Sequence, residues 1–346
     1  METPPPATVD QRDLLRHLVS AWGLAADEHL RYVPKGAGSY HWIAATLGKP
    51  AYFITVDDLD TKPWIGRERD ETFEGLSSAY EAASVLHDEA GLEVVVPALR
   101  RPDGSLTLRL SPQYSLAVFP FVEGNAGTWG DSLTESDRTL VLQEVASLHQ
   151  ATARVRVPIA HRPLDLPERP LLTAALAALD RPWEGGPYSE AARRALAVHV
   201  VDVTRWLEAL DLLARRLEET GTGTDVVITH GEPHPGNFMH TVEGLRLIDW
   251  DTVALARPER DLWMLDDGST RGFGSYEELT RRTVSTAAVD FYRLAWTLSD
   301  IASFASMFRS PHDETTWTQQ KWDGFQRLLE GAPSAPYGNP TQLGTI

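Results

Sequence analysis

The sequence predicts an α+β protein of two lobes: a small lobe of mostly antiparallel β-strands, followed by a larger and mostly helical lobe. Two observations predict this order. The first 122 residues combine short β-like runs with two helical patterns, and from residue 132 the pattern changes to long helices. One short β-rich insert, which carries most of the polar chemistry, interrupts the helical part. Two such lobes are expected to enclose a cleft.

The first lobe is predicted over residues 10–122. Its expected elements, in chain order, are a helix over 10–22, strands over 40–47 and 52–56, a helix over 72–90, and strands over 105–110 and 115–122. Leu14, Leu18 and Trp22 recur at helical spacing in the first element. The Gly48-Lys49-Pro50 segment suits a hairpin turn, and Gly91 suits the end of a helix.

The second lobe is predicted over residues 123–331. Its expected elements are helices near 134–156, 190–219, 276–309 and 313–331, with β-like runs at 226–229 and 245–250 between the second and third helices. Residues 1–9 are predicted to form a flexible tail, and residues 332–346, rich in Pro, Gly and Thr, a loose one. The sequence contains no internal repeat.

The composition excludes several classes of protein. The chain has 346 residues, with 32 Lys and Arg against 49 Asp and Glu, so its formal charge is −17. Such a surface repels nucleic acid and anionic membranes and attracts cationic small molecules, although it also simply favours solubility. The absence of Cys excludes disulfides and thiolate metal sites. With no bilayer-spanning apolar stretch and no targeting pattern, a cytoplasmic location is expected, without membrane or nucleic-acid partners.

Two polar loops follow apolar runs in the β-rich insert. The first contains His230, Glu232 and Asn237, and the second contains Asp249 and Asp251. Mg²⁺ binds through one or two oxygen-bearing side chains together with substrate phosphates, and Asn237 and Asp249 can supply those ligands if the loops meet. A carboxylate such as Glu232 can then orient or deprotonate an attacking hydroxyl, as phosphoryl transfer requires. Zinc on His230 and His234 is disfavoured because the intervening Gly and Pro residues prevent a helix.

The two loops carry a family resemblance. His230-Gly231-Glu232-x-x-x-x-Asn237 resembles the H-G-D-x-x-x-x-N loop of aminoglycoside and choline kinases, and Ile248-Asp249-Trp250-Asp251 resembles their metal-binding I-D-x-x segment. The resemblance spans roughly residues 30–310 and is nearest to the spectinomycin-phosphotransferase-like members. It implies a two-lobed, protein-kinase-like fold with an ATP cleft between the lobes, and a small-molecule kinase that uses Mg²⁺ and ATP, with GTP possible.

The resemblance also implies roles for individual residues. Asn237 and Asp249 would hold Mg²⁺, and Asp251 would assist a second metal ion or be structural. Glu232 occupies the position of the catalytic Asp, and His230 would brace the loop. The nucleotide would contact the partial glycine turn at Gly36, Gly38 and Ser39. It would also contact the hinge segment Phe119-Pro120-Phe121-Val122-Glu123-Gly124, whose backbone would bond adenine.

The sequence departs from the family pattern at two positions. Glu232 replaces the usual Asp, and a carboxylate displaced by roughly 1 Å is expected to slow or redirect the chemistry. Thr55 stands where the family carries its phosphate-binding Lys, which leaves the helix residue Glu81 without an obvious partner. Lys62 is the preferred substitute among the few lysines and Lys35 the second, although Lys62 could equally be a solvated loop charge.

Three functions fit these observations. The first is an ATP- or GTP-dependent phosphotransferase that modifies a cationic aminoglycoside or aminocyclitol, as in antibiotic resistance, with Glu123, Asp266 and Asp300 as candidate acceptor ligands. The second is a housekeeping kinase for choline, homoserine or a thio-sugar. The third is a degenerate member that binds nucleotide or ligand without transfer. The motifs do not name the acceptor, the nucleotide or the oligomeric state.

Overall fold

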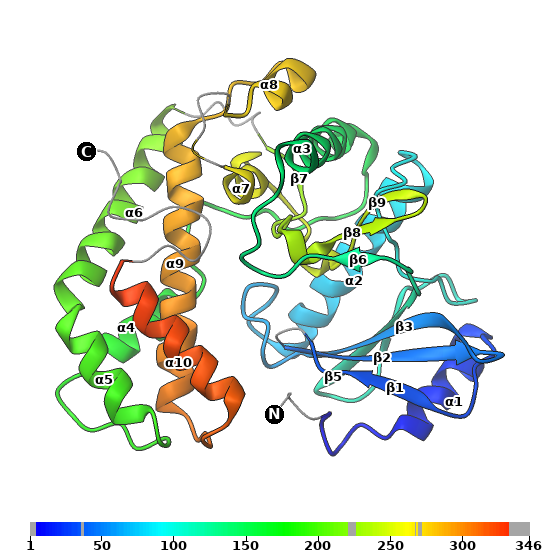
Figure 1. Cartoon of the computed structure of the whole chain (residues 1–346), viewed down its shortest axis with the longest axis horizontal. Helices are drawn as coiled ribbons and strands as arrows, with labels where there is room; N and C mark the ends of the chain where they lie inside the picture. Colours follow the sequence, from blue (N-terminus) through cyan, green and yellow to red (C-terminus); the bar gives the residue numbers. More distant parts are fainter. Residues whose placement is uncertain (1–4, 36–37, 221–225, 267, 269–271, 332–346) are drawn as a thin grey trace.

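The protein consists of an antiparallel β-sheet part followed by a helical part, as the sequence predicts (Figure 1). The computed structural model describes residues 5–35, 38–220, 226–266, 268 and 272–331. The remaining residues, which include the whole of the predicted C-terminal tail, lie outside the described part. Within the described part, no helix combines the length and apolar character needed to cross a membrane. The predicted lobe boundary near residue 122 stays a prediction.

The N-terminal part is a five-stranded antiparallel sheet in the order β1-β2-β3-β5-β4. Its elements are α1 (Gln11–Trp22), β1 (Leu30–Val33), β2 (Ser39–Thr46), β3 (Lys49–Asp58), α2 (Arg69–Asp88), β4 (Thr107–Arg109) and β5 (Tyr114–Pro120). Leu47 and Gly48 both adopt positive φ at the β2–β3 turn, which confirms the predicted hairpin. Asp10 caps the N-terminus of α1 through its side chain.

The two faces of this sheet have different partners because side chains alternate along a strand. Trp42, Ile54 and Val56 point toward α1 and share its apolar core. Ala117 and Phe119 belong to the opposite core, which is formed with α2. The odd-numbered positions of β3, which include Thr55 and Asp57, therefore lie on the face away from α1.

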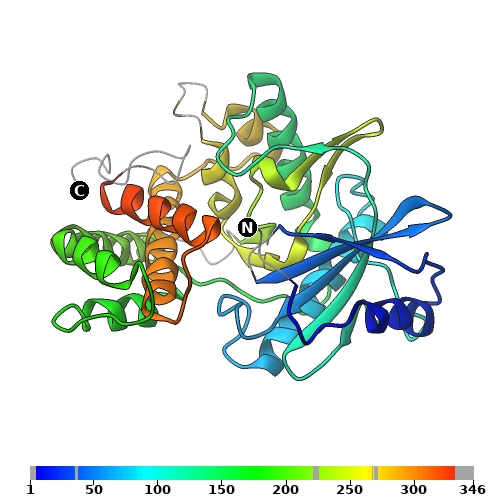
Figure 2. The ribbon, with the colours of Figure 1, turned by 60° about the horizontal axis from the view of Figure 1, so that its bottom comes forward.

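The C-terminal part contains two small sheets and most of the helices. Its elements are β6 (Asn125–Ala126), α3 (Glu135–Gln150), η1 (Ala151–Arg154), α4 (Arg169–Leu176), α5 (Ser189–Val198), α6 (Val200–Thr220), β7 (Val227–Thr229), η2 (Pro235–Asn237), β8 (Phe238–Thr241), β9 (Gly244–Leu247), η3 (Trp250–Thr252), β10 (Ala254–Ala256), α7 (Glu259–Leu262), η4 (Trp263–Leu265), α8 (Gly274–Thr280), α9 (Thr286–Arg309) and α10 (Thr316–Leu329). Figure 2 shows α9 and α10 beside the β7–β10 region, with α5 and α6 farther from the sheet.

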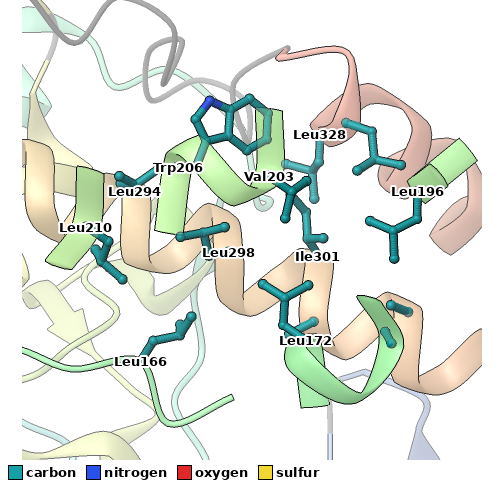
Figure 3. Packing of buried hydrophobic residues seen from close by; sticks show 14 of the residues in the cluster. Leu166, Leu172, Leu196, Val203, Trp206, Leu210, Leu294, Leu298, Ile301 and Leu328 are labelled. Carbon is teal, nitrogen blue, oxygen red and sulfur yellow. The ribbon is translucent and has the colours of Figure 1, made fainter. Parts of the chain in front are cut away.

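Helix α9 is the centre of the largest apolar core (Figure 3). Its residues Leu294, Leu298 and Ile301 are almost fully buried. The side chains that pack around them come from α4, α5, α6 and α10: Leu172, Leu196, Val203, Trp206, Leu210 and Leu328. Each fully buried aliphatic side chain contributes roughly 1.5–3 kcal/mol. This core holds α9, and the polar residues along it, in a fixed position.

Two predicted helices are each divided in the structure. The stretch predicted near 190–219 forms α5 and α6, which are separated at His199. Three β-branched residues lie around this break, Val198, Val200 and Val201, and such residues lower helix propensity. The stretch predicted near 276–309 forms α8 and α9. Between them Arg281 adopts a left-handed conformation, and Ser285 caps α9.

Other elements differ from the prediction in extent. The helix predicted to reach residue 156 ends at Gln150 and continues as the 3-10 turn η1. Helix α4 was not predicted, since it is short and contains Pro170 in its first turn, where proline is tolerated. The short strands β8 and β10 were also missed, because three or four residues carry too little alternation to detect.

Candidate active site

The loop after β7 contains a backbone conformation that requires glycine at position 231. Gly231 has φ of 100°, and a Cβ at this position would collide with the guanidinium of Arg260. That guanidinium donates hydrogen bonds to Thr229 Oγ1 (2.8 Å) and to the Thr252 carbonyl (3.0 Å). Arg260 therefore links the loop to the strand before it, through Thr229, and to the segment after Asp251, through Thr252.

Asp261 is the buried anchor of the same loop. Its carboxylate accepts hydrogen bonds from the backbone N–H groups of His230 (2.9 Å) and Gly231 (2.6 Å), and it lies 3.1 Å from His149 Nε2. The far nitrogen of His149, Nδ1, is 2.7 Å from the Tyr276 hydroxyl. Although burial opposes ionisation, the hydrogen bond from His149 holds the pKa of Asp261 below its usual value. Asp261 is thus a structural residue that holds the loop through buried hydrogen bonds.

His230 connects this loop with the one after β9. Its Nε2 lies 2.9 Å from the Ile248 carbonyl, and its Nδ1 accepts a hydrogen bond from the Glu232 N–H at 3.2 Å. Burial lowers the pKa of His230 to about 4, so the ring is neutral. A neutral ring with its proton on Nε2 satisfies both contacts. The edge of the ring also packs against Trp250, 4.7 Å between ring centroids.

The two predicted metal ligands come from these joined loops. The Ile248 N–H donates to the Asn237 carbonyl at 3.0 Å, which brings the loops together as the sequence analysis requires. The amide Nδ2 of Asn237 donates to the Glu232 carbonyl at 2.9 Å, and this bond directs Oδ1 the other way. Asp249 is exposed to the cleft and has a left-handed backbone, with φ of 68°. A strained non-glycine residue of this kind often marks a functional site.

This donor set fits Mg²⁺. One amide oxygen and one carboxylate beside a cleft match a metal ion that keeps several waters and takes its other ligands from phosphates. Within the described residues, no three His, Asp or Glu side chains gather as a ready-made metal cage. Asn237 and Asp249 are the residues that would hold the ion, and Asp251 lies two residues farther along the chain.

Glu232 lies in the loop after β7, and its side chain is partly open to solvent. Its carboxylate is 4.0 Å from His234 Nε2. Desolvation raises the pKa of Glu232 to about 7, and the negative charge of Asp251 contributes to the rise, whereas Arg260 and Lys62 oppose it. A carboxylate with a pKa near neutrality suits a general base.

Lys62 is buried and paired with two carboxylates. Its Nζ donates to Asp251 at 2.6 Å and lies 3.2 Å from Asp57 at the end of β3. The ammonium also lies 5.8 Å from the centre of the Trp64 ring. The alternative that Lys62 is a solvated loop charge is therefore wrong, since its side chain is only 2% exposed.

The expectation that Glu81 has no partner is also wrong. The guanidinium of Arg100 donates to both carboxylate oxygens of Glu81, at 2.9 and 3.0 Å. Arg100 follows α2 in a loop, and this long-range pairing could not be seen in the sequence. Glu81 is thus engaged on the outer side of α2.

Thr55 and His41 are neighbours on the N-terminal sheet. Thr55 Oγ1 lies 3.2 Å from His41 Nδ1 on the neighbouring strand, and the His41 ring stacks on Phe53 at 5.1 Å. Burial lowers the pKa of His41 to about 4. These residues lie on the sheet face away from α1.

The predicted nucleotide contacts around the glycine turn are placed only in part. Gly36 lies outside the described residues. Gly38 has φ of 75°, and a Cβ there would collide with Thr61. The hydroxyl of Ser39 donates to Asp57 at 2.8 Å, so it is already engaged within the protein. A phosphate contact from Ser39 stays a prediction.

The hinge segment differs in one detail from the expected arrangement. The Phe121 N–H donates to the Ala51 carbonyl at 2.9 Å, so this group is used within the sheet. The Phe119 ring packs edge-on against Tyr80 of α2, at 5.4 Å. Among the described residues, the N–H groups of Val122 and Glu123 have no backbone partner, and these are the donors left for a purine edge.

The three predicted acceptor ligands occupy different environments. Asp266 pairs with Arg293 at 2.6 Å, and its role as an acceptor ligand stays a prediction. Glu123 is exposed just after the hinge. Asp300 is partly buried on α9, and burial raises its pKa to about 7. Of the three, Asp300 has the environment expected of a binding carboxylate.

The rings of Trp296, Trp129 and His234 form an aromatic row between Asp300 and the loop after β7. Trp296, one turn before Asp300 on α9, stacks on Trp129 at 5.3 Å with an interplanar angle of 19°. Trp129 contacts the ring of His234 edge-on at 4.6 Å. The row therefore runs from the neighbour of Glu232 to the neighbour of Asp300. Trp42, by contrast, is buried in the N-terminal core and lies away from this row.

Several polar residues of the site were not singled out from the sequence. Asp57 and Tyr80 meet at 3.2 Å, and His41 lies beside Thr55. Near Asp300, burial raises the pKa of Glu168, and burial together with the neighbouring Arg260 lowers the pKa of Arg162 to about 10. Strand alternation could have placed Asp57 beside Thr55, but the other positions depend on long-range packing.

Comparisons with known proteins agree with this geometry. Residues 43–276 match the family model described as the phosphotransferase enzyme family. The protein StrN of Streptomyces griseus is 29% identical over 282 residues, which cover 77% of this chain and 80% of StrN.

Solved structures share the fold at low sequence identity. Spectinomycin phosphotransferase APH(9)-Ia, in complex with ADP and spectinomycin, superposes with a TM-score of 0.71 at 16% identity, covering 95% of this chain and 96% of that one. A microcompartment-associated aminopropanol kinase gives 0.59 at 18% identity, over 91% and 94% of the two chains. Choline kinase LicA from Streptococcus pneumoniae gives 0.53 at 16%, over 92% and 97%.

Proposed function

Because this chain belongs to the phosphotransferase enzyme family, we propose that it transfers the γ-phosphate of ATP to a hydroxyl of a small, polar, cationic acceptor. One observation carries this proposal: hydrogen bonds join the loops after β7 and β9, which brings Asn237, Asp249 and Glu232 close to one another. Phosphoryl transfer needs this combination of metal ligands and an aligned carboxylate.

The donor side lies under the sheet. A nucleotide there would place its base near the free N–H groups of Val122 and Glu123 and its phosphates near the Asn237–Asp249 pair. Mg²⁺ at that pair would neutralise charge on the phosphates. The relatives crystallised with ADP and with AMP support a nucleotide in this cleft.

Glu232 is the residue proposed to receive the proton of the acceptor hydroxyl. Its carboxylate is partly open to solvent and has a pKa of about 7. The nearest ring nitrogen, His234 Nε2, is 4.0 Å away. Arg260 supports the loop backbone below it. The hydroxyl would have to approach between Glu232 and the His234–Trp129 contact.

Removal of the Glu232 charge tests this role. The Glu232→Gln protein is expected to transfer phosphate about 10²–10⁴-fold more slowly, with unchanged affinity for ATP, because only the proton acceptor is lost. Steady-state rates and calorimetric ATP binding measure the two quantities. The Glu232→Asp protein is the matched control, since it retains a carboxylate. A Glu232→Gln rate within a factor of three of the wild type would remove Glu232 from this role.

The acceptor side lies between the catalytic loop and α9. Asp300, with Glu168 as a neighbouring carboxylate, supplies negative charge at this position, and Trp129 and Trp296 supply aromatic surface. Ammonium groups bind well where a carboxylate and ring faces occur together. The complex of the structural neighbour with spectinomycin supports an aminocyclitol as the acceptor class.

The charge of Asp300 predicts a pH dependence of acceptor binding. Burial raises the pKa of Asp300 to about 7, so the carboxyl becomes neutral as the pH falls below that value. The affinity for spectinomycin or another bound amine, measured by calorimetry without nucleotide, is expected to fall between pH 8 and pH 6. The charged groups that face Asp300 are Lys321 on α10 and Glu168 before α4.

The Asp300→Asn protein is expected to lose this pH dependence and to bind the amine about tenfold more weakly at pH 8. The Asp266→Asn protein is the matched control, because Asp266 is paired with Arg293. Equal behaviour of the two variants would place the amine elsewhere.

An acceptor panel tests the reaction itself. The purified protein with Mg²⁺-ATP or Mg²⁺-GTP is mixed with aminocyclitols, aminoglycosides, choline and small sugars, and nucleoside diphosphate release and acceptor mass are followed together. A mass increase of one phosphate on a single acceptor establishes transfer and names the substrate. Nucleotide binding without transfer to any acceptor of a widened panel would favour a binding protein instead.

A further inference from the structure

We propose that Lys62, delivered from the loop after β3, is the phosphate-binding lysine of this protein, and that Asp57 is the residue that holds it. The proposal rests on the nucleotide cleft proposed above. It differs from the family pattern in both residues: the lysine does not come from β3 itself, and its partner does not come from α2. Nothing in the known motifs assigns either role.

Because Lys62 is buried and paired, it places a fixed positive charge beside the loop that contains Asp249 and Asp251. Its side chain is 2% exposed, although it follows a surface loop, and its Nζ bridges Asp57 at 3.2 Å and Asp251 at 2.6 Å. Asp251 is two residues from Asp249, so the ammonium lies beside the proposed phosphate position. Burial opposes the charge, but Asp251 and Asp57 outweigh it and raise the pKa of Lys62, so the ammonium form is kept.

Strand geometry explains how a lysine outside β3 can replace one on it. Thr55 and Asp57 are two residues apart on one face of β3, so their Cα atoms are separated by roughly 7 Å. A lysine at position 55 would extend its ammonium over about that distance. The Lys62 ammonium, which contacts Asp57, therefore occupies space that a lysine from position 55 could reach.

The Asp57 carboxylate has three side-chain partners that fix its position. It accepts hydrogen bonds from Ser39 Oγ (2.8 Å) and Tyr80 Oη (3.2 Å) in addition to its ion pair with Lys62. These three partners come from β2, α2 and the loop after β3, so the carboxylate is fixed from three directions. In related kinases, a glutamate of the corresponding helix holds the lysine. In this protein the helix residue Glu81 is bound to Arg100 instead.

The ion pair between Lys62 and Asp251 is the contact that a bound phosphate would replace. Lys62 can keep Asp57 as a partner and exchange Asp251 for a phosphate oxygen, because its ammonium has three N–H donors. The two aspartates thus have different roles: Asp57 is retained, and Asp251 is the contact that is given up. Substitutions of the two sides of the Lys62–Asp251 pair should therefore have opposite consequences for a phosphate-bearing ligand.

Binding without metal isolates this contact. ATP and adenosine are titrated by calorimetry in EDTA against the wild type, Asp251→Asn, and the double variant Lys62→Met/Asp251→Asn. The double variant removes one charge of each sign together, so it leaves no unpaired charge from that pair. Lys49→Met, which removes an exposed lysine of the same lobe at the start of β3, is the matched control.

The expected result is specific to phosphate. Asp251→Asn binds ATP at least as tightly as the wild type, and the double variant binds ATP roughly ten- to hundredfold more weakly than Asp251→Asn, the usual worth of a charge-assisted hydrogen bond. Adenosine affinity and the control variant stay unchanged. As a rescue, adding Thr55→Lys to the double variant is expected to restore part of the ATP affinity.

Two results would overturn the proposal. Equal ATP affinity of Asp251→Asn and the double variant would show that Lys62 does not contact phosphate. A parallel loss of ATP and adenosine affinity would show that Lys62 only supports the fold. If either occurred while the wild type still transferred phosphate to an acceptor, the proposed function would stand and only the role of Lys62 would fall.

Discussion

The Asp249→Asn protein is expected to lose phosphate transfer by at least about 10²-fold, because a metal ligand that neutralises the transferred group is removed. Asn keeps the size of the side chain and tolerates the left-handed backbone at this position, which most other residues do not. The loss should therefore come from charge and not from the fold. Coupled assay of nucleoside diphosphate release with the acceptor found in the panel measures it.

The stability of the same variant supplies an independent check. Desolvation and the negative charges of Asp251 and Glu232 disfavour the charged form of Asp249, so Asp249→Asn removes this cost in the metal-free protein. The melting temperature without metal is expected to be equal to that of the wild type or higher. Asp313→Asn, at an exposed aspartate after α9, is the control. Transfer within tenfold of the wild type would show that Asp249 is not a ligand of the working metal ion.

The second large effect is expected at Asp261. The Asp261→Ala protein should lose about 3–5 kcal/mol of unfolding free energy, since one substitution leaves the His149 ring and two buried backbone N–H groups without their acceptor. Urea unfolding followed by tryptophan fluorescence measures the loss. Transfer should also fall, because the backbone of His230 and Gly231 sets the direction of Glu232.

A surface aspartate separates this effect from a general loss of acidic charge. Asp103→Ala removes a carboxylate that is bonded only within its own exposed turn, and no measurable change in stability is expected. If Asp261→Ala were as stable as Asp103→Ala, the three buried contacts would not be what holds the catalytic loop. Retained stability with lost transfer would instead indicate a direct part for Asp261 in the reaction.

The sequence predicted the parts of the site that are local. The loops containing Asn237 and Asp249 could be read because each follows an apolar strand and presents a short set of polar side chains. The pairing of those loops through Ile248 and the anchoring by Asp261 follow from the same segments, which lie close together in the chain. For the same reason, the β2–β3 hairpin and the helix α1 agree with prediction.

The contacts that could not be predicted join distant segments. Lys62 and Asp251 are separated by 189 residues, and nothing in the sequence around Lys62 says that its loop turns inward. Arg100 was not recognised as the partner of Glu81, nor Arg293 as the partner of Asp266, because ion pairs depend on tertiary packing. The break between α5 and α6 was missed because helical periodicity continues through it.

The outward pairing of Glu81 with Arg100 has a consequence for control of the enzyme. In protein kinases, swinging the helix that carries the equivalent glutamate breaks its bond to the phosphate-binding lysine and switches the enzyme off. Here the lysine is held by the sheet through Asp57, and α2 reaches that carboxylate only through one phenol, Tyr80. Displacing α2 would leave the ion pair between Lys62 and Asp57 in place. If Lys62 binds phosphate as proposed above, we therefore expect that a movement of α2 alone does not switch off this protein.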